Sequence, residues 1–249
     1  MIRLRYVLLA AAGVLPVLSG WSAWSASPAP THAVGPQATA LFSAANDFWS
    51  QEFSSLGGQY QPATLALFRQ QVRGACDTQA ALTGSFYCPA DQRVYLDQTF
   101  LEQVAQRADG ASDLALAYII GHEIGHHVQY LSGTTALVEQ ARSRSAPALS
   151  ARTWSTAELQ ADCYAGLWMR SAAKRGRIQR ATDASVAPAL EAVTALSEQW
   201  STHLAAGHTM ADPFTRSAAA QRLKWFERGL DSGDAGACNT FRAAAAGQL

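Results

Sequence analysis

The most informative stretch of the chain is residues 121–127, which read Gly-His-Glu-Ile-Gly-His-His. Within it, His122 to His126 form an H-E-x-x-H pattern. Each residue of a helix advances by about 100°, so His122 and His126 lie roughly 40° apart on one face. Two imidazole nitrogens placed in this way can bind one zinc ion. Glu123 lies beside them, where it can take a proton from a zinc-activated water.

The surrounding residues favour a helix with two different faces. Apolar residues occupy the side opposite the two histidines: Ala117, Ile120, Ile124, Val128 and Leu131. We expect this helix to begin at Ser112 or Asp113, which can cap it, and to end near Gly133. His127 lies about 140° from His122, so we expect it to be structural or to support a ligand. The alternative for the whole motif is a solvated helix face that carries two histidines.

A catalytic zinc ion needs a third protein ligand and an open position. The candidate lies in residues 158–162, which read Glu-Leu-Gln-Ala-Asp. Glu158 and Asp162 are four residues apart and therefore share a helix face. We expect Glu158 to bind the metal and Asp162 to accept a hydrogen bond from a ligand imidazole. The alternative for Glu158 is a capping box with Ser155, at the start of a predicted helix.

The first residues form a segment of their own. Arg3 and Arg5 precede an uncharged apolar run over residues 6–18, and small residues follow it. This pattern is typical of a signal peptide, and the alternative is a membrane anchor over residues 6–21. We expect the remainder to be exported: periplasmic or secreted, or anchored to the inner membrane. The predicted parts are the export segment 1–25, a linker over 26–36 and a domain over 37–249.

Composition limits the class of protein. The 249 residues include 19 Lys and Arg and 19 Asp and Glu, and 49% of them are hydrophobic. A charge-balanced chain lacks the basic surface of a nucleic-acid binder, and this apolar content is too high for a disordered chain. Alanine, which favours helix, supplies much of the apolar content. We therefore expect a helix-dominated α+β domain, with a small β-sheet beside the histidine helix and no nucleic-acid partner.

Hydrophobic spacing predicts the other elements. Helices are expected over residues 37–53, 134–150, 155–174, 185–206 and 217–230. Pro147 should break the second of these. The best strand candidate is Arg93–Asp97. We expect this strand to offer an exposed edge that holds an extended substrate by main-chain pairing.

The four cysteines fit an exported chain. An even count in such a chain suggests disulfides. Cys76 and Cys88 are close in sequence and flank a turn-like segment, which leaves Cys163 and Cys238 to pair. Cys163 lies about 140° around the helix from Glu158, so it points away from the predicted metal. The alternative is four buried free thiols.

Taken together, His122–Gln129 and Glu158–Gly166 resemble the bacterial neutral zinc metallopeptidase family. Further matching segments are Phe86–Asp91, Val94–Asp97, Gln221–Phe226, Asp231–Asp234 and Cys238–Phe241. The resemblance extends over roughly residues 40–242. It implies a zincin fold, similar in arrangement to the gluzincin group. It also implies one zinc ion bound by His122, His126 and Glu158, with Glu123 as the general base.

One segment departs from the family pattern, which has Thr-His-Gly-Thr before the Gln-Arg pair. Here residues 215–218 read Thr-Arg-Ser-Ala. If the family histidine stabilises an oxyanion, its absence weakens catalysis. Arg216 or the nearby His208 is the candidate to supply positive charge instead. The alternative for His208 is a loop histidine with no role.

These observations predict an exported zinc-dependent metallopeptidase that acts on a peptide or protein substrate. Two alternatives remain open. The first is a zinc-binding pseudo-peptidase that binds a partner, which Arg216 favours. The second is a zinc amidase that acts on cell-wall peptide. Membrane association is expected only through the N-terminal segment.

Overall fold

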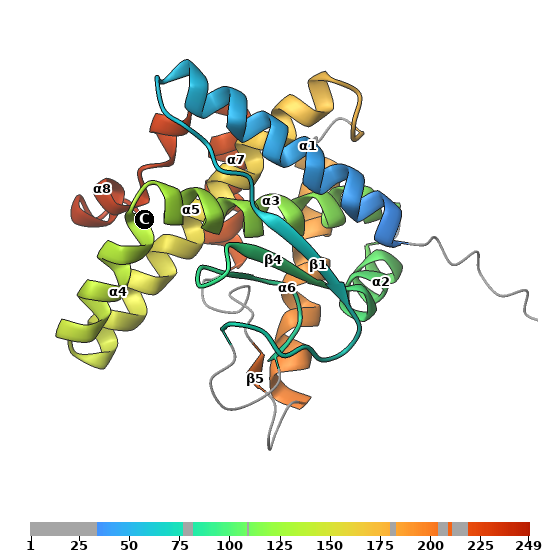
Figure 1. Ribbon diagram of the computed structural model, residues 1–249, viewed down its shortest axis with the longest axis horizontal. Coiled ribbons are helices and arrows are strands. Elements are labelled where there is room, and N and C mark those ends of the chain that lie inside the picture. Colours follow the sequence, from blue (N-terminus) through green and yellow to red (C-terminus); the bar gives the residue numbers. More distant parts are fainter. Residues whose placement is uncertain (1–33, 77–81, 109, 180–182, 204–208, 211–218) are drawn as a thin grey trace, which may run out of the picture. The chain divides into compact units, whose positions relative to one another are not determined.

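The computed structural model describes residues 34–76, 82–108, 110–179, 183–203, 209–210 and 219–249. Within this part of the chain, helices dominate and a small three-stranded sheet lies beside them (Figure 1). The fold class is therefore the helix-rich α+β that the composition predicts. The predicted export segment and most of the predicted linker lie outside the described residues.

The helices are α1 (Val34–Ser55), α2 (Gln98–Arg107), α3 (Ser112–Leu131), α4 (Thr134–Arg144), α5 (Pro147–Lys174), α6 (Asp183–His203), α7 (Ala219–Ser232) and α8 (Thr240–Ala245). A 3-10 turn, Ala235–Cys238, precedes α8. The strands are β1 (Thr64–Phe68), β2 (Leu82–Thr83), β3 (Phe86–Cys88), β4 (Arg93–Asp97) and β5 (Thr209–Met210). Helices α1, α3, α6 and α7 and strand β4 lie where hydrophobic spacing predicts them.

Helix α5 begins earlier than the sequence predicts. Pro147 is its first residue, and the preceding helix α4 ends at Arg144, so the helical stretch is interrupted next to Pro147 as predicted. Proline is tolerated at this position because the first N–H groups of a helix have no partner within it. Ser155 consequently lies in the interior of α5. The capping-box alternative for Glu158 is therefore wrong, because the helix does not start there.

Strand β4 is the central strand of the three-stranded sheet. The strand order is β1-β4-β3, with β4 parallel to β1 and antiparallel to β3. Both edges of β4 are thus paired within the protein. The expectation that Arg93–Asp97 offers an exposed edge to a substrate is wrong. Among the described strands of this sheet, β1 and β3 each have one unpaired edge.

Helix α3 is the centre of the core. All residues from Leu114 to Gly125 are buried, and α3 contacts α1, α2, α4, α5, α6 and β3. His122 and Glu123 are both fully buried. The alternative of a solvated histidine face is therefore wrong. A helix that is apolar around most of its circumference is normally buried in this way.

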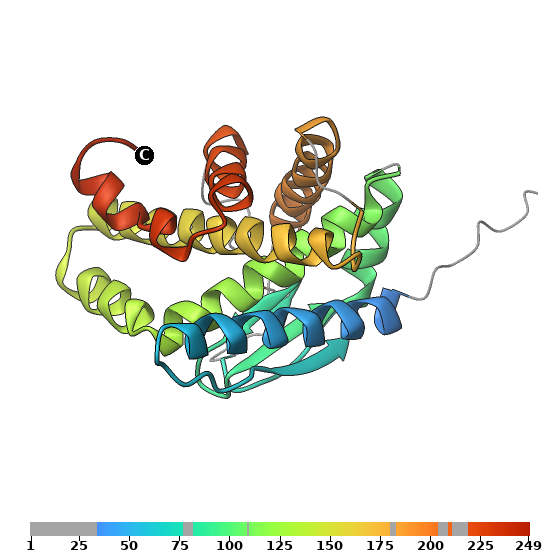
Figure 2. The same cartoon turned by 90° about the horizontal axis from the view of Figure 1, so that it is seen from above.

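Helix α5 lies between α3 and α7 (Figure 2). Small residues allow both close approaches. A Cβ atom on Gly125 of α3 would lie 3.0 Å from the Cα atom of Ala161 on α5. On the other side, a Cβ atom on Gly166 of α5 would lie 2.0 Å from the carbonyl oxygen of Phe226. The crossing helices therefore meet backbone to backbone on both sides of α5.

The four cysteines form the two pairs that the sequence predicts. Cys76 and Cys88 are joined at an S–S distance of 2.03 Å, and Cys163 and Cys238 at 2.02 Å. The first pair fixes the segment before β3, and the second ties α5 to the 3-10 turn. The alternative of four free thiols is wrong.

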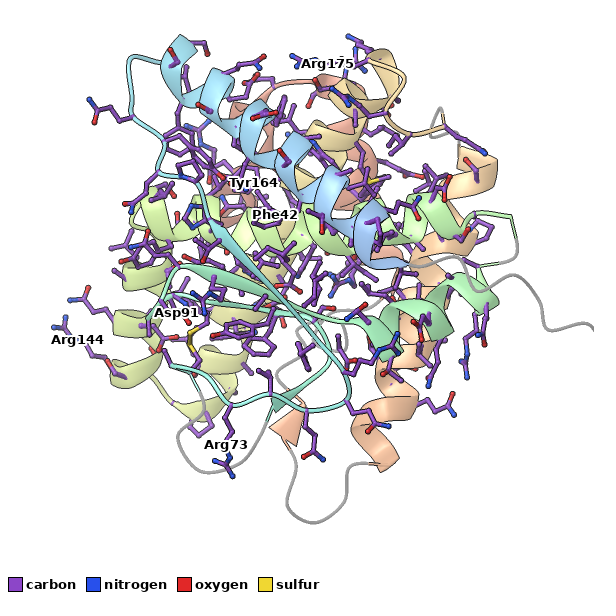
Figure 3. All side chains as sticks on the ribbon, turned by 45° about the vertical axis from the view of Figure 1, so that its right-hand side comes forward. Phe42, Arg73, Asp91, Arg144, Tyr164 and Arg175 are labelled. Carbon is purple, nitrogen blue, oxygen red and sulfur yellow. A yellow bond between two sulfur atoms is a disulfide. The ribbon has the colours of Figure 1, made fainter. Side chains whose placement is uncertain are left out.

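The surface and interior differ as expected for a globular domain. Figure 3 shows Phe42 and Tyr164 among the packed helices, whereas Arg73, Arg144 and Arg175 extend outward. None of the described helices combines the length and the apolar character that a membrane span requires.

Candidate metal centre

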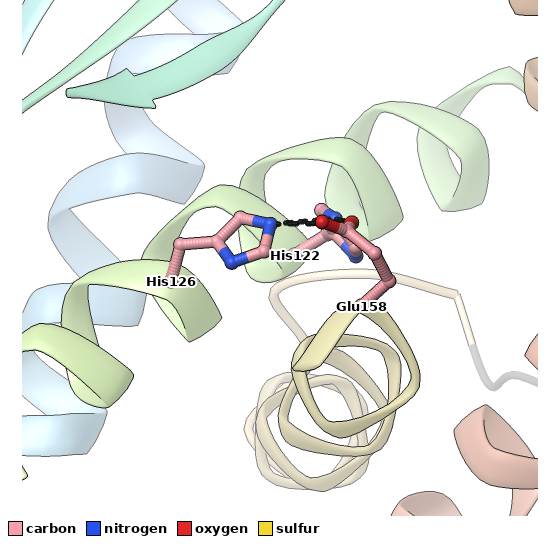
Figure 4. Close-up of side chains that lie close together, drawn as sticks. All are labelled: His122, His126 and Glu158. Atoms are coloured by element: carbon pink, nitrogen blue, oxygen red, sulfur yellow. Dashed lines mark hydrogen bonds and ion pairs between the residues drawn. The ribbon is translucent and has the colours of Figure 1, made fainter. Parts of the chain in front are cut away.

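Three side chains meet where α3 crosses α5 (Figure 4). His122 and His126 project from α3, and Glu158 projects from α5. The Nε2 atoms of the two histidines are 3.1 Å apart. Oε2 of Glu158 lies 3.3 Å from Nε2 of His122 and 3.5 Å from Nε2 of His126. The three donor atoms thus form a compact triangle at the helix crossing.

The triangle fits a zinc ion in both chemistry and size. Two imidazoles and one carboxylate are ligand types that catalytic zinc uses. Nitrogen and oxygen ligands about 2.0–2.1 Å from a tetrahedral metal are about 3.3 Å from one another. The observed separations of 3.1, 3.3 and 3.5 Å lie around that value. Oε2 of Glu158 is also buried and accepts no hydrogen bond within the described residues, which leaves it available to a cation.

Asp162 orients the first histidine. Nδ1 of His122 donates a hydrogen bond to Oδ1 of Asp162 at 2.9 Å. A proton on Nδ1 leaves the lone pair of Nε2 directed at the triangle. Such a carboxylate partner fixes the tautomer and raises the basicity of a metal-binding imidazole. The hydrogen bond from His122 to Asp162 is the one that the sequence predicts, and metal binding by Glu158 stays a prediction.

Arg222 and Tyr118 hold Asp162 in turn. Nη2 of Arg222 and the hydroxyl of Tyr118 each donate to Oδ1 of Asp162 at 2.7 Å. Arg222 also donates to the Tyr118 hydroxyl, through Nε at 3.1 Å and Nη2 at 2.7 Å. Burial opposes the charge of Arg222, yet Asp162 and Tyr118 raise its pKa above the usual value. A buried carboxylate is costly without such a partner, so the guanidinium stabilises the charged form of Asp162.

The sequence patterns assign no role to Arg222. One signal could have found it: Arg222 shares helical spacing with Trp225, Phe226 and Gly229, all of which are buried. An arginine on the buried face of an amphipathic helix needs a buried anionic partner. Which carboxylate it meets depends on how α7 packs against α5, and that information is absent from local spacing.

Gln129 orients the second histidine. Like Arg222, it is given no role by the H-E-x-x-H pattern. Nδ1 of His126 donates to Oε1 of Gln129 at 2.9 Å. Nε2 of Gln129 donates to the carbonyl of Ala157 at 2.7 Å and to Oε1 of Gln160 at 3.1 Å. Gln160 in turn donates to the carbonyl of Cys238 at 3.1 Å. Both imidazoles therefore direct Nε2 at the triangle, and the second is linked to the C-terminal segment.

His127 has a structural role. Its Nε2 donates to the carbonyl of Gln61 at 2.7 Å, and its Nδ1 accepts from the hydroxyl of Tyr87 at 2.9 Å. Burial lowers the pKa of His127, which favours the neutral ring. Both ring nitrogens are used in tying α3 to the sheet region, so His127 is not a candidate ligand.

Charges at the centre favour a bound cation. Burial opposes the imidazolium of His122, but its interactions with the carboxylates of Asp162 and Glu158 raise its pKa to about 9. Burial alone would raise the pKa of Glu158, but His126 and His122 outweigh it and the pKa is lowered. Positive charge is therefore stabilised at this place, whether a proton or a metal ion carries it.

Glu123 lies beside the triangle and is fully buried. Neither of its carboxylate oxygens accepts a hydrogen bond in the described part of the chain. Burial raises its pKa, and the nearby His122 and His126 oppose that shift. Together with His126 and Glu158, Glu123 lines a pocket of about 280 Å³. A carboxylate with unused acceptors at such a pocket can take up a proton from a group bound there.

The two candidate residues for oxyanion stabilisation, His208 and Arg216, lie outside the described residues. Their proposed role therefore stays a prediction.

The chain matches the family described as "Putative neutral zinc metallopeptidase" over residues 22–241. The protein YpfJ of Escherichia coli (strain K12) is 36% identical over 201 residues, which are 81% of this chain and 69% of YpfJ. Rv2575 of Mycobacterium tuberculosis (strain H37Rv) is 34% identical over 193 residues, 74% of this chain and 64% of that protein. Both are named as uncharacterized proteins, so their names carry no activity. No solved structure matches the chain. On the extent of the family match, the chain belongs to this neutral zinc metallopeptidase family.

Proposed function

We propose that this protein is an exported zinc-dependent peptidase of the gluzincin type, with Glu123 as its general base. One observation carries the proposal: the donor atoms of His122, His126 and Glu158 converge beside a buried carboxylate with unused acceptors. The same carboxylate faces a pocket large enough for part of a substrate. Family membership supports the peptidase class.

His122 and His126 would hold the zinc ion through Nε2, and Glu158 would hold it through a carboxylate oxygen. When bound, zinc supplies Lewis-acid chemistry: it polarises a carbonyl group and lowers the pKa of water. Asp162 and Gln129 keep the two imidazoles in the tautomer that presents a lone pair to the metal. These partners also prevent rotation of the rings, so the donor atoms stay in place.

Glu123 would move the proton. Its carboxylate accepts a proton from the attacking water and then delivers it to the amine that leaves when the peptide bond breaks. Burial, which raises its pKa, makes this carboxylate a stronger base than an exposed one. Glu123 lines the pocket, and its two carboxylate oxygens have no hydrogen-bond partner among the described residues.

Export is supported by the two cystine pairs. Disulfides persist in oxidising compartments and are rare in the cytosol of mesophiles. Pairing of all four cysteines is what such a compartment would produce. The predicted signal peptide or anchor over residues 1–25 agrees with this location.

Glu123→Gln tests the proposal. Glutamine keeps the shape of the side chain but cannot accept the proton, and Glu123 is not one of the three donors. We expect the variant to keep its zinc and its fold and to lose about 10²–10⁴-fold in peptide cleavage. The measurement is cleavage of a broad peptide library by zinc-replete protein. A parent that cleaves nothing, and equals the variant, would instead support the pseudo-peptidase.

A further inference from the structure

We infer that the pocket beside the metal centre is a specificity pocket for one large apolar or aromatic side chain of the substrate. The inference rests on the proposed function and names its substrate class. The side chain belongs to a residue that directly flanks the cleaved bond, because Glu123, His126 and Glu158 form one wall of the pocket. Any group that fills the pocket is therefore next to the reacting atoms.

The rest of the wall is mainly apolar. Its apolar members come from β3 and the following turn, from α4 and from α5: Phe86, Tyr87, Pro89, Val138, Trp154 and Ala157. Burying an apolar side chain against such a wall is favourable, at about 25 cal/mol for each Å² removed from water. A charged or strongly polar side chain would lose its hydration there without gaining equal partners.

The size of the pocket fits one large side chain. Its volume is about 280 Å³. An apolar cavity of about 150 Å³ already binds a benzene molecule. The pocket therefore has room for a leucine, methionine or phenylalanine side chain together with some of the adjoining main chain.

Acidic side chains are disfavoured by the cost of removing them from water. Glu139 of α4 lines the pocket together with Glu123 and Glu158. Glu139 is exposed, and Glu123 and Glu158 are buried beside the proposed metal ion, whose positive charge offsets theirs. We therefore expect aspartate and glutamate to be disfavoured because the apolar wall cannot replace their hydration.

The apolar wall is held in place before any substrate binds. Phe86 stacks on Tyr95 of β4, with ring centroids 4.8 Å apart and planes 8° from parallel. Cys76 lines the pocket and is joined to Cys88 of β3. A preformed wall lowers the entropic cost of binding, which favours a selective pocket over an adaptable surface.

Cleavage of a peptide library by the zinc-loaded protein tests the inference. We expect Leu, Met or Phe at one position flanking the cleaved bond, with kcat/KM about tenfold or more above that for Ala, Asp or Glu. In Val138→Phe the added ring occupies the pocket, because Val138 is 4% exposed and lines it. The preference of this variant at the flanking position should shift toward Ala and Gly. Its kcat/KM for peptides with Phe at that position should fall about tenfold or more.

The neighbouring change Leu137→Phe is the matched control. Leu137 lies on the same helix, is 68% exposed and does not line this pocket. We expect the control to keep the parent's preference. If Val138→Phe does not fold, Trp154→Ala takes its place: it enlarges the pocket and should raise the relative rate for Trp peptides. A parent that cleaves peptides without preference at the flanking positions would overturn the inference.

A binding measurement separates this inference from the proposed function. The probes are two zinc-binding hydroxamates, one with a benzyl and one with a carboxymethyl side chain, measured by calorimetry on the zinc-loaded protein. We expect the benzyl compound to bind about tenfold or more tightly, and Val138→Phe to remove the difference. This result without any peptide cleavage would defeat the proposed function and keep the pocket assignment. Equal binding of both probes would overturn the pocket assignment.

Discussion

Each imidazole of the candidate metal centre is fixed by a buried partner at its Nδ1 atom. His122 donates to Asp162, and His126 donates to Gln129. Asp162 is charged and depends on Arg222, whereas Gln129 is neutral and is held by main-chain and amide groups. The two histidines therefore differ in their support: one is electrostatic and the other is a chain of neutral hydrogen bonds.

The support of Asp162 leads to a prediction for Arg222. Arg222→Met removes the buried cation and leaves the buried charge of Asp162 uncompensated. We expect the free energy of unfolding to fall by about 3–5 kcal/mol, measured by urea titration. In an Asp162→Asn background the same change should cost less, because the charge is gone. Equal costs in both backgrounds would show that Arg222 does not act through Asp162.

Some of the centre could be predicted from the sequence and some could not. The common face of His122 and His126 follows from helix geometry alone, as does that of Glu158 and Asp162. The partners Gln129 and Arg222 depend on contacts made by other elements. Arg222 is 60 residues from Asp162 in sequence, and no local pattern joins them.

At the scale of elements, the position of the donor atoms depends on how closely α3 and α5 cross. Gly125 lies between His122 and His126 in sequence and meets Ala161, which lies between Glu158 and Asp162. The same contact that brings the helices together therefore sets the distance from the histidines to the carboxylates.

Gly125→Ala tests this dependence. The new Cβ atom would lie 3.0 Å from both the Cα atom and the carbonyl oxygen of Ala161, so the helices must separate. We expect a loss of about 1–3 kcal/mol in unfolding free energy from overpacking, which outweighs the gain of up to about 1 kcal/mol in helix propensity. Zinc affinity should fall as well. The control is Gly58→Ala, whose Cβ atom would approach no atom closer than 3.4 Å. A stabilised Gly125→Ala protein would contradict the account.

The elements with clear periodicity could be predicted, and those without it could not. The amphipathic spacing of α1 and α7 marks them in the sequence, and a long run of apolar residues between two turn signals marks α3. Helix α2 was missed because it follows β4 without a turn: Asp97 ends the strand and also caps the helix by accepting from the N–H of Thr99. The paired edges of β4 could not be foreseen either, since pairing with β1 joins segments that are remote in sequence.

At the scale of the whole described domain, the Cys163–Cys238 pair connects the C-terminal segment to the candidate metal centre. Cys163 follows Asp162 directly on α5. The carbonyl of Cys238 accepts from Gln160, which holds Gln129 and through it His126. The C-terminal segment is therefore part of the support of the site.

Removing the disulfides one at a time tests that connection. Replacing both cysteines of the Cys163–Cys238 pair by alanine should cost about 4 kcal/mol in unfolding free energy, because the closed loop is long. It should also weaken zinc binding, measured by competition with a chelator. The matched change replaces Cys76 and Cys88 by alanine and so removes a disulfide that closes a shorter loop. It should lower the free energy of unfolding by about 3 kcal/mol and leave zinc affinity unchanged. Equal zinc affinity in both double variants would contradict the proposed link.

The most direct test of the central claim is anomalous diffraction at the zinc absorption edge from crystals of the zinc-loaded protein. The account predicts one strong peak about 2.0–2.2 Å from Nε2 of His122, Nε2 of His126 and a carboxylate oxygen of Glu158. The peak should be absent from crystals of His126→Ala prepared in the same way. A zinc peak at any other place, or full occupancy in His126→Ala, would contradict the assignment of these three residues as the metal site.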